Sequence, residues 1–262
     1  MKKPPLFEIR LLNDLPHALK RREFELYFQP QFDVSTLHVT GAETLIRWNH
    51  PLFGTLSPQA FLPLLEYLHL DEGLDAWVLK EACKQNKQWQ QAGLPPIKIG
   101  VNAYTERFEH PNWSDLVKSA LEESELDGQW LEIEMTEHSK LTSIHEAYRT
   151  IQALDDLGVQ VALDDFGTGH ASLFALKVLP FHTLKLDKSF LQNLDETKAT
   201  TLAESVVQMA KRLNLTMVAE GVEEEDQLIF LKTQGCHQAQ GYYLGKPMNQ
   251  TSFATFLKQQ NA

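Results

Sequence analysis

Short apolar runs alternate with helical patterns along most of the chain, and a polar residue closes each run. The runs follow a Gly, Asn or Pro that can end a helix, as in Leu157-Gly158 before VQVALDD. Helical patterns are expected over residues 75–91, 111–123, 145–157, 196–213 and 223–233. This alternation is typical of βα units that build a parallel sheet.

The polar closing residues select the kind of parallel sheet. They are Gln29, Glu43, Asn102, Glu134, Asp164, Asp187, Glu220 and Gln240. After Asn102 they follow one another at intervals of 20 to 33 residues, and a (β/α)8 barrel of about 250 residues needs about 31 per unit.

Two intervals near the start differ from this spacing. Too few residues separate Gln29 from Glu43 for a crossover helix, so we expect the first strand to be antiparallel to the rest. The long interval from Glu43 to Asn102 predicts an extra helix around residues 58–68. We therefore predict an α/β fold, a TIM-like (β/α)8 barrel, as a single domain over residues 1–262 with a leading segment and helix in 1–23.

Composition excludes several classes of protein. The formal net charge of −11 argues against a basic face, and so against DNA or RNA as a partner. No window approaches the ~18–20 apolar residues of a membrane span, and we expect no signal peptide because no apolar stretch follows the two N-terminal lysines. The two cysteines, Cys83 and Cys236, have no metal-ligand spacing and are typical of reduced thiols, so we expect a cytoplasmic protein.

Acidic residues gather where the strands of such a barrel end, which is the rim that carries active sites. A single carboxylate there would most simply favour the start of the next helix. Many carboxylates at one rim cannot all ionise without a counter-charge, so either several are protonated or divalent cations bind. The nearby cations are Lys185 and Arg47. The carboxylates are Glu43, Glu134, Glu137, Asp164, Asp165, Asp187, Glu220 and Glu223.

The donor types at this rim indicate its chemistry. All are oxygens, which favour Mg²⁺ or Mn²⁺ over Zn²⁺ or copper. Adjacent Asp164 and Asp165 can bridge two ions, and two ions ~3.5–4 Å apart clamp an in-line displacement at a phosphodiester. Lys185 shares a strand face with Asp187 and can orient the attacking water. The residues therefore predict metal-assisted hydrolysis of a phosphate ester.

Eight motifs in this order resemble EAL domains, bacterial phosphodiesterases for the second messenger cyclic di-GMP. They span nearly the whole chain and include the Glu43-Thr44-Leu45 signature. The motifs are LYFQP at 26–30, ETLIRWNHP at 43–51, VNAYTERF at 101–108, EIEMTE at 132–137, DDFGTG at 164–169, LKLDKSF at 184–190, VAEGVE at 218–223 and QGYYLGKP at 240–247. The resemblance implies a TIM-like barrel with an antiparallel first strand, two divalent cations (Mg²⁺ or Mn²⁺), and hydrolysis of cyclic di-GMP to linear pGpG.

The resemblance also assigns roles to residues. It implies Glu43, Asn102, Glu134 and Asp164 as ligands of one ion, and Asp164 and Asp165 as ligands of the second. It makes Lys185, which positions the attacking water, catalytic together with Glu43, Glu137 and Glu220. Gln29 and Arg47 match substrate contacts, Arg47 to a phosphate. Asp187, Glu223 and Gln240 are placed with the substrate-binding residues or with the network around the ions.

The chain departs from the family pattern at two places. Thr44 replaces the usual alanine, which is expected to tune the rate. His170-Ala171 replaces the common Tyr-Ser in the loop after Asp165. That loop and the following helix help to form a dimer in similar proteins, so we expect a homodimer there.

Three other functions would also place acidic residues at this rim. One is a receptor that holds cyclic di-GMP without cleaving it. An enolase-like lyase also uses Mg²⁺ and a Lys on barrel strands, but the adjacent Asp164-Asp165 pair argues against it. A glycosidase uses only two catalytic carboxylates and leaves the others unexplained. The residues contain no sensor domain, so a free-standing enzyme and one end of a longer signalling protein both remain open.

Overall fold

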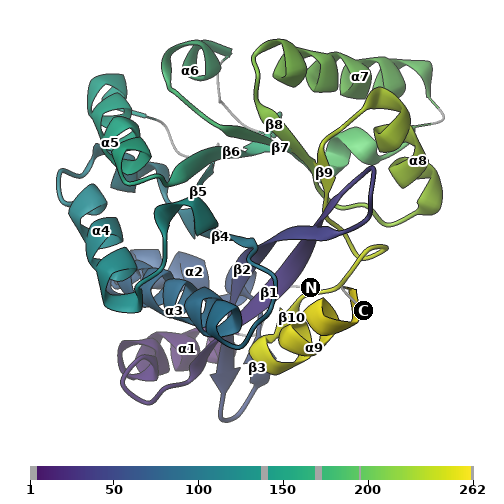
Figure 1. Cartoon of the computed structure of the whole chain (residues 1–262). Helices are drawn as coiled ribbons and strands as arrows, with labels where there is room; N and C mark the ends of the chain where they lie inside the picture. The colour runs from purple at the N-terminus through teal and green to yellow at the C-terminus, as the bar shows by residue number, and fades with distance from the viewer. Residues whose placement is uncertain (1–4, 137–140, 169–172, 195, 261–262) are drawn as a thin grey trace.

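Eight strands close into a barrel in the computed structural model, which describes residues 5–136, 141–168, 173–194 and 196–260. The barrel strands are β1 (Phe24–Asp33), β2 (Val39–His50), β4 (Lys98–Ala103), β5 (Leu131–Thr136), β6 (Gln160–Phe166), β7 (Thr183–Leu186), β8 (Thr216–Ala219) and β9 (Gln238–Ala239). Strand β1 is antiparallel to both its neighbours, β2 and β9, whereas β2 and β4 to β9 run parallel to one another (Figure 1). The predicted TIM-like barrel with an antiparallel first strand is confirmed.

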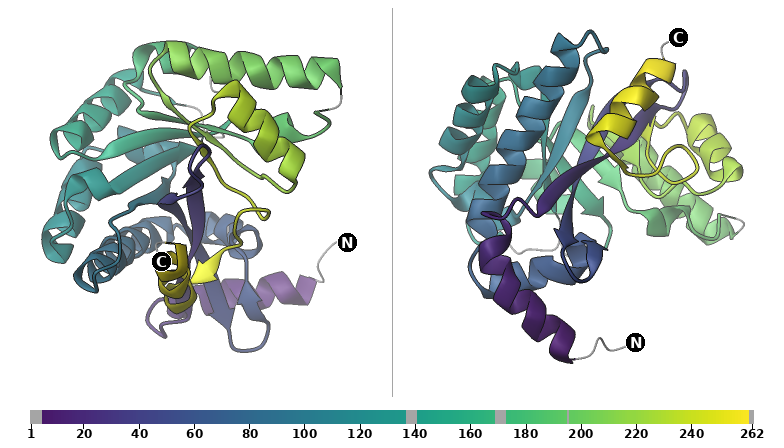
Figure 2. Two further views of the ribbon diagram at one scale, coloured as in Figure 1. Left: turned by 45° about the vertical axis from the view of Figure 1, so that its right-hand side comes forward. Right: turned by 90° about the horizontal axis from the view of Figure 1, so that it is seen from below.

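Helices surround this barrel (Figures 1 and 2). They are α1 (Pro5–Ala18), α2 (Pro58–Tyr67), α3 (Asp71–Gln91), α4 (Trp113–Ser124), α5 (Ile144–Asp156), α6 (Leu173–Val178), α7 (Thr197–Arg212), α8 (Glu225–Gln234) and α9 (Gln250–Gln260). The extra helix predicted between the second strand and Asn102 is α2. Among the described residues, no helix combines the length and apolar character needed to cross a membrane.

Short elements complete the chain. Three 3₁₀ turns follow or precede barrel strands: η1 (Thr105–Glu109), η2 (Gly128–Trp130) and η3 (Lys188–Leu191). Strands β3 (Gly54–Leu56) and β10 (Met248–Asn249) extend the sheet beyond the barrel, beside β2 and β1. The sequence did not predict β3, β10 or α9, because runs of two or three residues carry no readable period and α9 follows no barrel strand.

Gln29 and Glu43 correct one expectation. Both were expected to close their strands, but β1 continues to Asp33 and β2 to His50. The two residues instead lie directly opposite each other in the antiparallel β1–β2 pair. Strands β1 and β2 are longer than the other barrel strands because they pair with each other from Phe24 opposite Trp48 to Phe32 opposite Val39, so Gln29 and Glu43 lie in mid-strand.

The strands separate an apolar outer layer from a polar interior. Residues such as Ile99, Ile133 and Val161 are buried in the core cluster. Alternate positions of the strands carry buried polar groups, including Glu132 and Glu134 on β5 and Lys185 on β7. Since successive side chains point to opposite faces of a strand, the polar set lines the inside of the barrel. The site is therefore held by a sheet whose outer face is anchored to the helices.

Candidate active site

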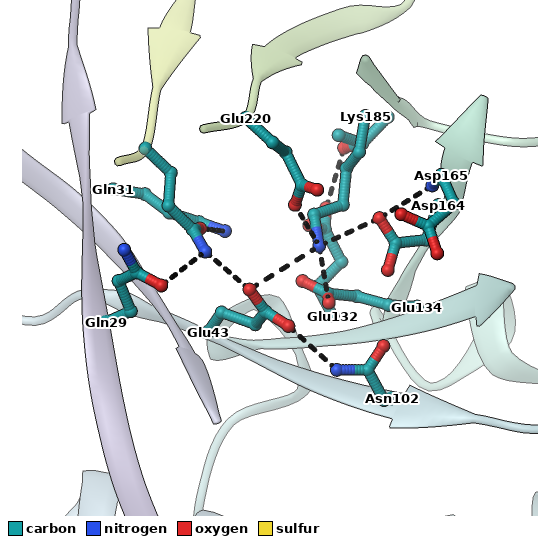
Figure 3. A network of polar contacts seen from close by, with 12 residues as sticks. Gln29, Gln31, Glu43, Asn102, Glu132, Glu134, Asp164, Asp165, Lys185 and Glu220 are labelled. Atoms are coloured by element: carbon teal, nitrogen blue, oxygen red, sulfur yellow. Dashed lines mark hydrogen bonds and ion pairs between the residues drawn. The ribbon is translucent and has the colours of Figure 1, made fainter. Parts of the chain in front are cut away.

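The ammonium group of Lys185, on β7, lies at the centre of a group of carboxylates (Figure 3). Its Nζ is 2.7 Å from Glu134 Oε2 and 2.8 Å from Glu220 Oε1. It is 3.1 Å from Asp164 Oδ1 and 3.9 Å from Glu43 Oε2. Strands β2, β5, β6 and β7 and the residue after β8 thus bring these five residues to one point.

A glycine on β4 makes room for Glu134. In the parallel register, Asn102 pairs with Glu134 and Gly100 pairs with Glu132. A Cβ placed on Gly100 would lie only 2.2 Å from Glu134 Oε1. The carboxylate of Glu134 therefore lies over the bare Cα of Gly100, and the side chain of any other residue there would displace it.

A local irregularity in β6 turns two consecutive aspartates toward the same site. Neighbouring residues of a regular strand point to opposite faces. Here the register with β7 shifts between Leu163 and Phe166, and Asp165 has φ 55°, in the left-handed region. Asp165 N–H donates to Asp164 Oδ1 at 2.9 Å. Aspartate tolerates this conformation better than most residues, which explains how the Asp164-Asp165 pair can supply both carboxylates.

Amide side chains hold Glu43 from two sides. Asn102 Nδ2 donates to Glu43 Oε1 at 2.9 Å, and Gln240 Nε2 donates to Glu43 Oε2. Gln240 Nε2 also donates to Gln29 Oε1 at 3.3 Å, and Gln29 Nε2 donates to the Gly245 carbonyl at 3.1 Å. Four of the residues predicted from the sequence are thus joined in one network.

The electrostatics of the cluster are dominated by burial and like charge. Burial raises the pKa values of Glu134, Asp164 and Glu220, although Lys185 opposes this. Burial lowers the pKa of Lys185, but the surrounding carboxylates outweigh it and the net pKa is raised. Lys185 is therefore held as the ammonium ion. Its single positive charge stabilises several carboxylates at once.

The oxygen atoms form two overlapping sets that suit divalent cations. Glu43, Glu134 and Asp164 offer oxygens within 4.8 Å of one another, and so do Asp164, Asp165 and Glu220. Glu134 Oε1 is buried and has no hydrogen-bond partner among the described residues. Because a buried carboxylate oxygen without a partner is costly and hard cations prefer oxygen ligands, these residues fit Mg²⁺ or Mn²⁺.

Comparison with known proteins identifies the family. The model of the EAL domain family matches residues 12–247, which is most of the chain. This chain belongs to the EAL domain family. It is 38% identical over 242 residues to the bifunctional diguanylate cyclase/cyclic di-GMP phosphodiesterase MucR of Pseudomonas aeruginosa, covering 92% of this chain and 35% of MucR. It is 34% identical over 252 residues to the cyclic di-GMP phosphodiesterase NbdA of the same organism, covering 96% of this chain and 32% of NbdA.

Solved structures of EAL proteins have the same fold. The PaMucR phosphodiesterase in complex with c-di-GMP superposes with a TM-score of 0.88 at 37% identity, covering 93% of this chain and 99% of that one. The EAL enzyme Bd1971, with cAMP and cyclic di-GMP bound, gives a TM-score of 0.89 at 27% identity, covering 98% and 70%. This EAL domain spans about a third of the length of the curated relatives it matches.

The remaining predicted site residues of this EAL domain lie around the cluster or apart from it. Arg47, on β2, lies over the Tyr27 ring at 5.4 Å and donates to the Ile46 carbonyl at 2.9 Å. Asp187 caps η3 by accepting from Ser189 N–H at 2.9 Å. Glu223 is exposed before α8. Glu137 and His170 lie outside the described residues.

Asp75 borders the site of this EAL domain and was not predicted from the sequence. A cavity of about 360 Å³ extends from Glu43 and Asp164 toward α2 and α3 and includes Asp75. Asp75 accepts from Arg107 Nε at 2.8 Å, yet burial raises its pKa to about 6. The sequence gives little indication that Asp75 belongs to the site. An aspartate early in a predicted helix is most simply explained by its favourable interaction with the helix N-terminus.

Proposed function

We propose that this EAL domain hydrolyses one phosphodiester bond of cyclic di-GMP and releases linear pGpG, in bacterial second-messenger signalling. The observation that carries the proposal is the gathering of four carboxylates around Lys185, with Asp165 beside two of them. The four are Glu43, Glu134, Asp164 and Glu220, and Asp165 lies with Asp164 and Glu220. The names of the similar proteins MucR and NbdA, and the c-di-GMP complex of PaMucR, support this substrate.

The proposed active form contains two divalent cations, Mg²⁺ or Mn²⁺. Glu43, Asn102, Glu134 and Asp164 would hold one, and Asp164 and Asp165 the other, with Glu220 beside them. Divalent ions at such a site polarise phosphate oxygens and lower the pKa of water to about 7.

The side chains of the protein would orient the attacking water and the substrate. Lys185, kept charged by the acids around it, orients the attacking water, and Glu220 fixes its Nζ at 2.8 Å. Arg47 contributes a charge-assisted contact to a phosphate, and Gln29 an amide contact to the substrate. Gln240 supports both Gln29 and Glu43. Asp187, Glu137 and Glu223 complete the proposed set, as the family motifs suggest.

Direct assay tests the proposal. Purified protein incubated with cyclic di-GMP and Mg²⁺ or Mn²⁺ should yield pGpG, and EDTA should stop the reaction. Glu43→Ala should abolish turnover, whereas Thr44→Ala, the matched change one residue away, should preserve it. Inactivity of the folded wild-type protein in both metals would reject hydrolysis, and tight binding without product would identify a receptor.

The assembly and location are also proposals. We propose that residues 1–262 form a single EAL-type unit that pairs as a homodimer through the loop after Asp165 and helix α6. Leu173 and Phe174 of α6 are 65% and 53% exposed, which supports such a contact. The size of the protein in solution tests the proposed homodimer.

We propose a cytoplasmic location, because the buried, free Cys83 and Cys236 suit a reducing compartment.

A further inference from the structure

Gln31 is a buried polar residue of the barrel interior to which the family motifs assign no role. It follows Gln29 by two positions on β1, so both side chains point into the barrel. Its cross-strand partner on β2 is Gly41, just as Glu43 is the partner of Gln29. Gln31 therefore lies one layer below the proposed ligands, and its hydrogen bond reaches them through another residue.

That residue is Gln240, and the hydrogen bonds between them have a defined direction. Gln31 Nε2 donates to Gln240 Oε1 at 3.1 Å. Gln240 Nε2 donates in turn to Gln29 Oε1 and to Glu43 Oε2. The Gln240 NH₂ is the group that faces Glu43, because it donates to the carboxylate oxygen there. The Gln240 carbonyl oxygen then points toward β1 and needs a donor there, which Gln31 supplies.

The strands around Gln31 are shaped to hold this amide. A Cβ on Gly41 would lie 2.7 Å from Gln31 Oε1 and 3.1 Å from the Lys98 carbonyl. Glycine at 41 thus leaves the space that the Gln31 side chain fills. The contact also crosses the seam where β1 meets β9, at Phe32 opposite Ala239 and Asp33 opposite Gln238.

We propose that Gln31 is a positioning residue that fixes the orientation of the Gln240 amide, and through it Glu43 and Gln29. Without the donor, Gln240 Oε1 is a buried acceptor with no partner, and the Gln240 side chain loses the contact that holds it in place. Movement of this amide would weaken both hydrogen bonds that its NH₂ donates, to Glu43 and to Gln29. The inference rests on the proposed function for its effect on turnover, but not for its effect on cation binding.

Gln31→Met tests this, because methionine keeps the length and volume of the side chain and removes the donor. Residues that orient metal ligands typically contribute 10–100-fold to affinity or activity. We expect Mn²⁺ binding, measured by calorimetry without substrate, and kcat/KM for cyclic di-GMP each to fall ~10–100-fold. Gln240→Met should show a similar loss. The double variant should be little worse than Gln240→Met alone, because both changes break one chain of contacts.

Thr183→Val is the matched control. It removes a buried hydrogen bond in the same barrel interior, from Thr183 Oγ1 to Glu132 at 2.7 Å. It should lower Tm while leaving Mn²⁺ affinity and kcat/KM within about twofold. Gly41→Ala displaces Gln31 without altering its chemistry and should shift both quantities in the same direction as Gln31→Met, which provides a second test if Gln31→Met fails to fold.

The outcomes separate this inference from the proposed function. Unchanged Mn²⁺ affinity in folded Gln31→Met, or losses that add fully to those of Gln240→Met, would overturn the positioning role. If the wild type binds Mn²⁺ but does not cleave cyclic di-GMP, the proposed function fails, while the Mn²⁺ affinities of the variants still decide the role of Gln31.

Discussion

At the scale of single residues, Lys185 shows how a fully buried charge is tolerated. Removing an ammonium group from water costs several kcal/mol unless ion pairs offset it. Its Nζ is within 3.1 Å of oxygens of Glu134, Asp164 and Glu220. The same acids are too many for one lysine, which is the physical reason to expect cations.

Thr44 provides a prediction at this scale. It is buried, and its hydroxyl has no hydrogen-bond partner among the described residues. A buried polar group without a partner costs about 1–3 kcal/mol, so isosteric Thr44→Val should raise the free energy of unfolding by ~1 kcal/mol. Denaturant unfolding measures this, and turnover should stay within about twofold. A loss of stability would show that the hydroxyl is satisfied in the folded protein.

At the scale of elements, Arg107 ties the turn η1 to the start of α3. Its guanidinium pairs with Asp71, with Glu72 at 3.2 Å and with Asp75 at 2.8 Å. These acids occupy the first two turns of α3, where negative charge is favourable. The cluster therefore fixes the wall of the cavity beside the proposed cation site.

The pKa of Asp75 predicts a pH dependence for this wall. Burial raises it from 3.8 to about 6, so between these values the folded state keeps a proton that the unfolded state has lost. The contribution of Asp75 to stability is therefore greatest below pH 3.8 and falls as the pH rises through about 6. The Asp75→Asn side chain does not titrate, so this variant does not lose stability through this group as the pH rises. The Tm of Asp75→Asn minus the Tm of the wild type should therefore increase from pH 4 to pH 7.

The control for Asp75→Asn changes a neighbour of the same guanidinium. Glu72 contacts Arg107 with a side chain that is 73% exposed. Thermal melts of Glu72→Gln should run parallel to those of the wild type across the same pH range. A Tm difference between Asp75→Asn and wild type that does not vary with pH would contradict the prediction.

At the scale of the whole molecule, the proposed cations would join strands that are far apart in the chain. Glu43, Glu134 and Asp164 lie on β2, β5 and β6. Ligands that bind only the folded state stabilise it by mass action. Mn²⁺ at about a hundred times its Kd should therefore raise the free energy of unfolding by ~2.7 kcal/mol, and EDTA should reverse the effect.

Variants locate that stabilisation. Glu134→Gln removes the negative charge of one of these three carboxylates. It should therefore abolish most of the Mn²⁺-induced shift in Tm. Glu225→Gln, at an exposed carboxylate where α8 begins, should retain the wild-type shift. Equal shifts in both variants would show that Mn²⁺ stabilises the protein from another place.

Much of the fold could be predicted from the sequence because the patterns that indicate it are local. The Gly, Asn and Pro stops, the short apolar runs and the spacing of their polar ends are properties of neighbouring residues. The interval from Gln29 to Glu43 sufficed to predict the antiparallel start. The oxygen donors that gather at the rim could also be predicted, since the carboxyl ends of parallel barrel strands meet there whatever the side chains are.

The sequence alone determined the eight-strand alternation and the all-oxygen character of the site, because periodicity and residue type act over a few positions. Only the tertiary structure decided that Lys185 lies at the centre of the acids, that β6 breaks at Asp165, that Gln31 supports Gln240 and that Asp75 borders the cavity. These features join residues up to about two hundred positions apart, as in the pair Gln31 and Gln240. Their geometry depends on the closure and register of the barrel, which no local pattern encodes.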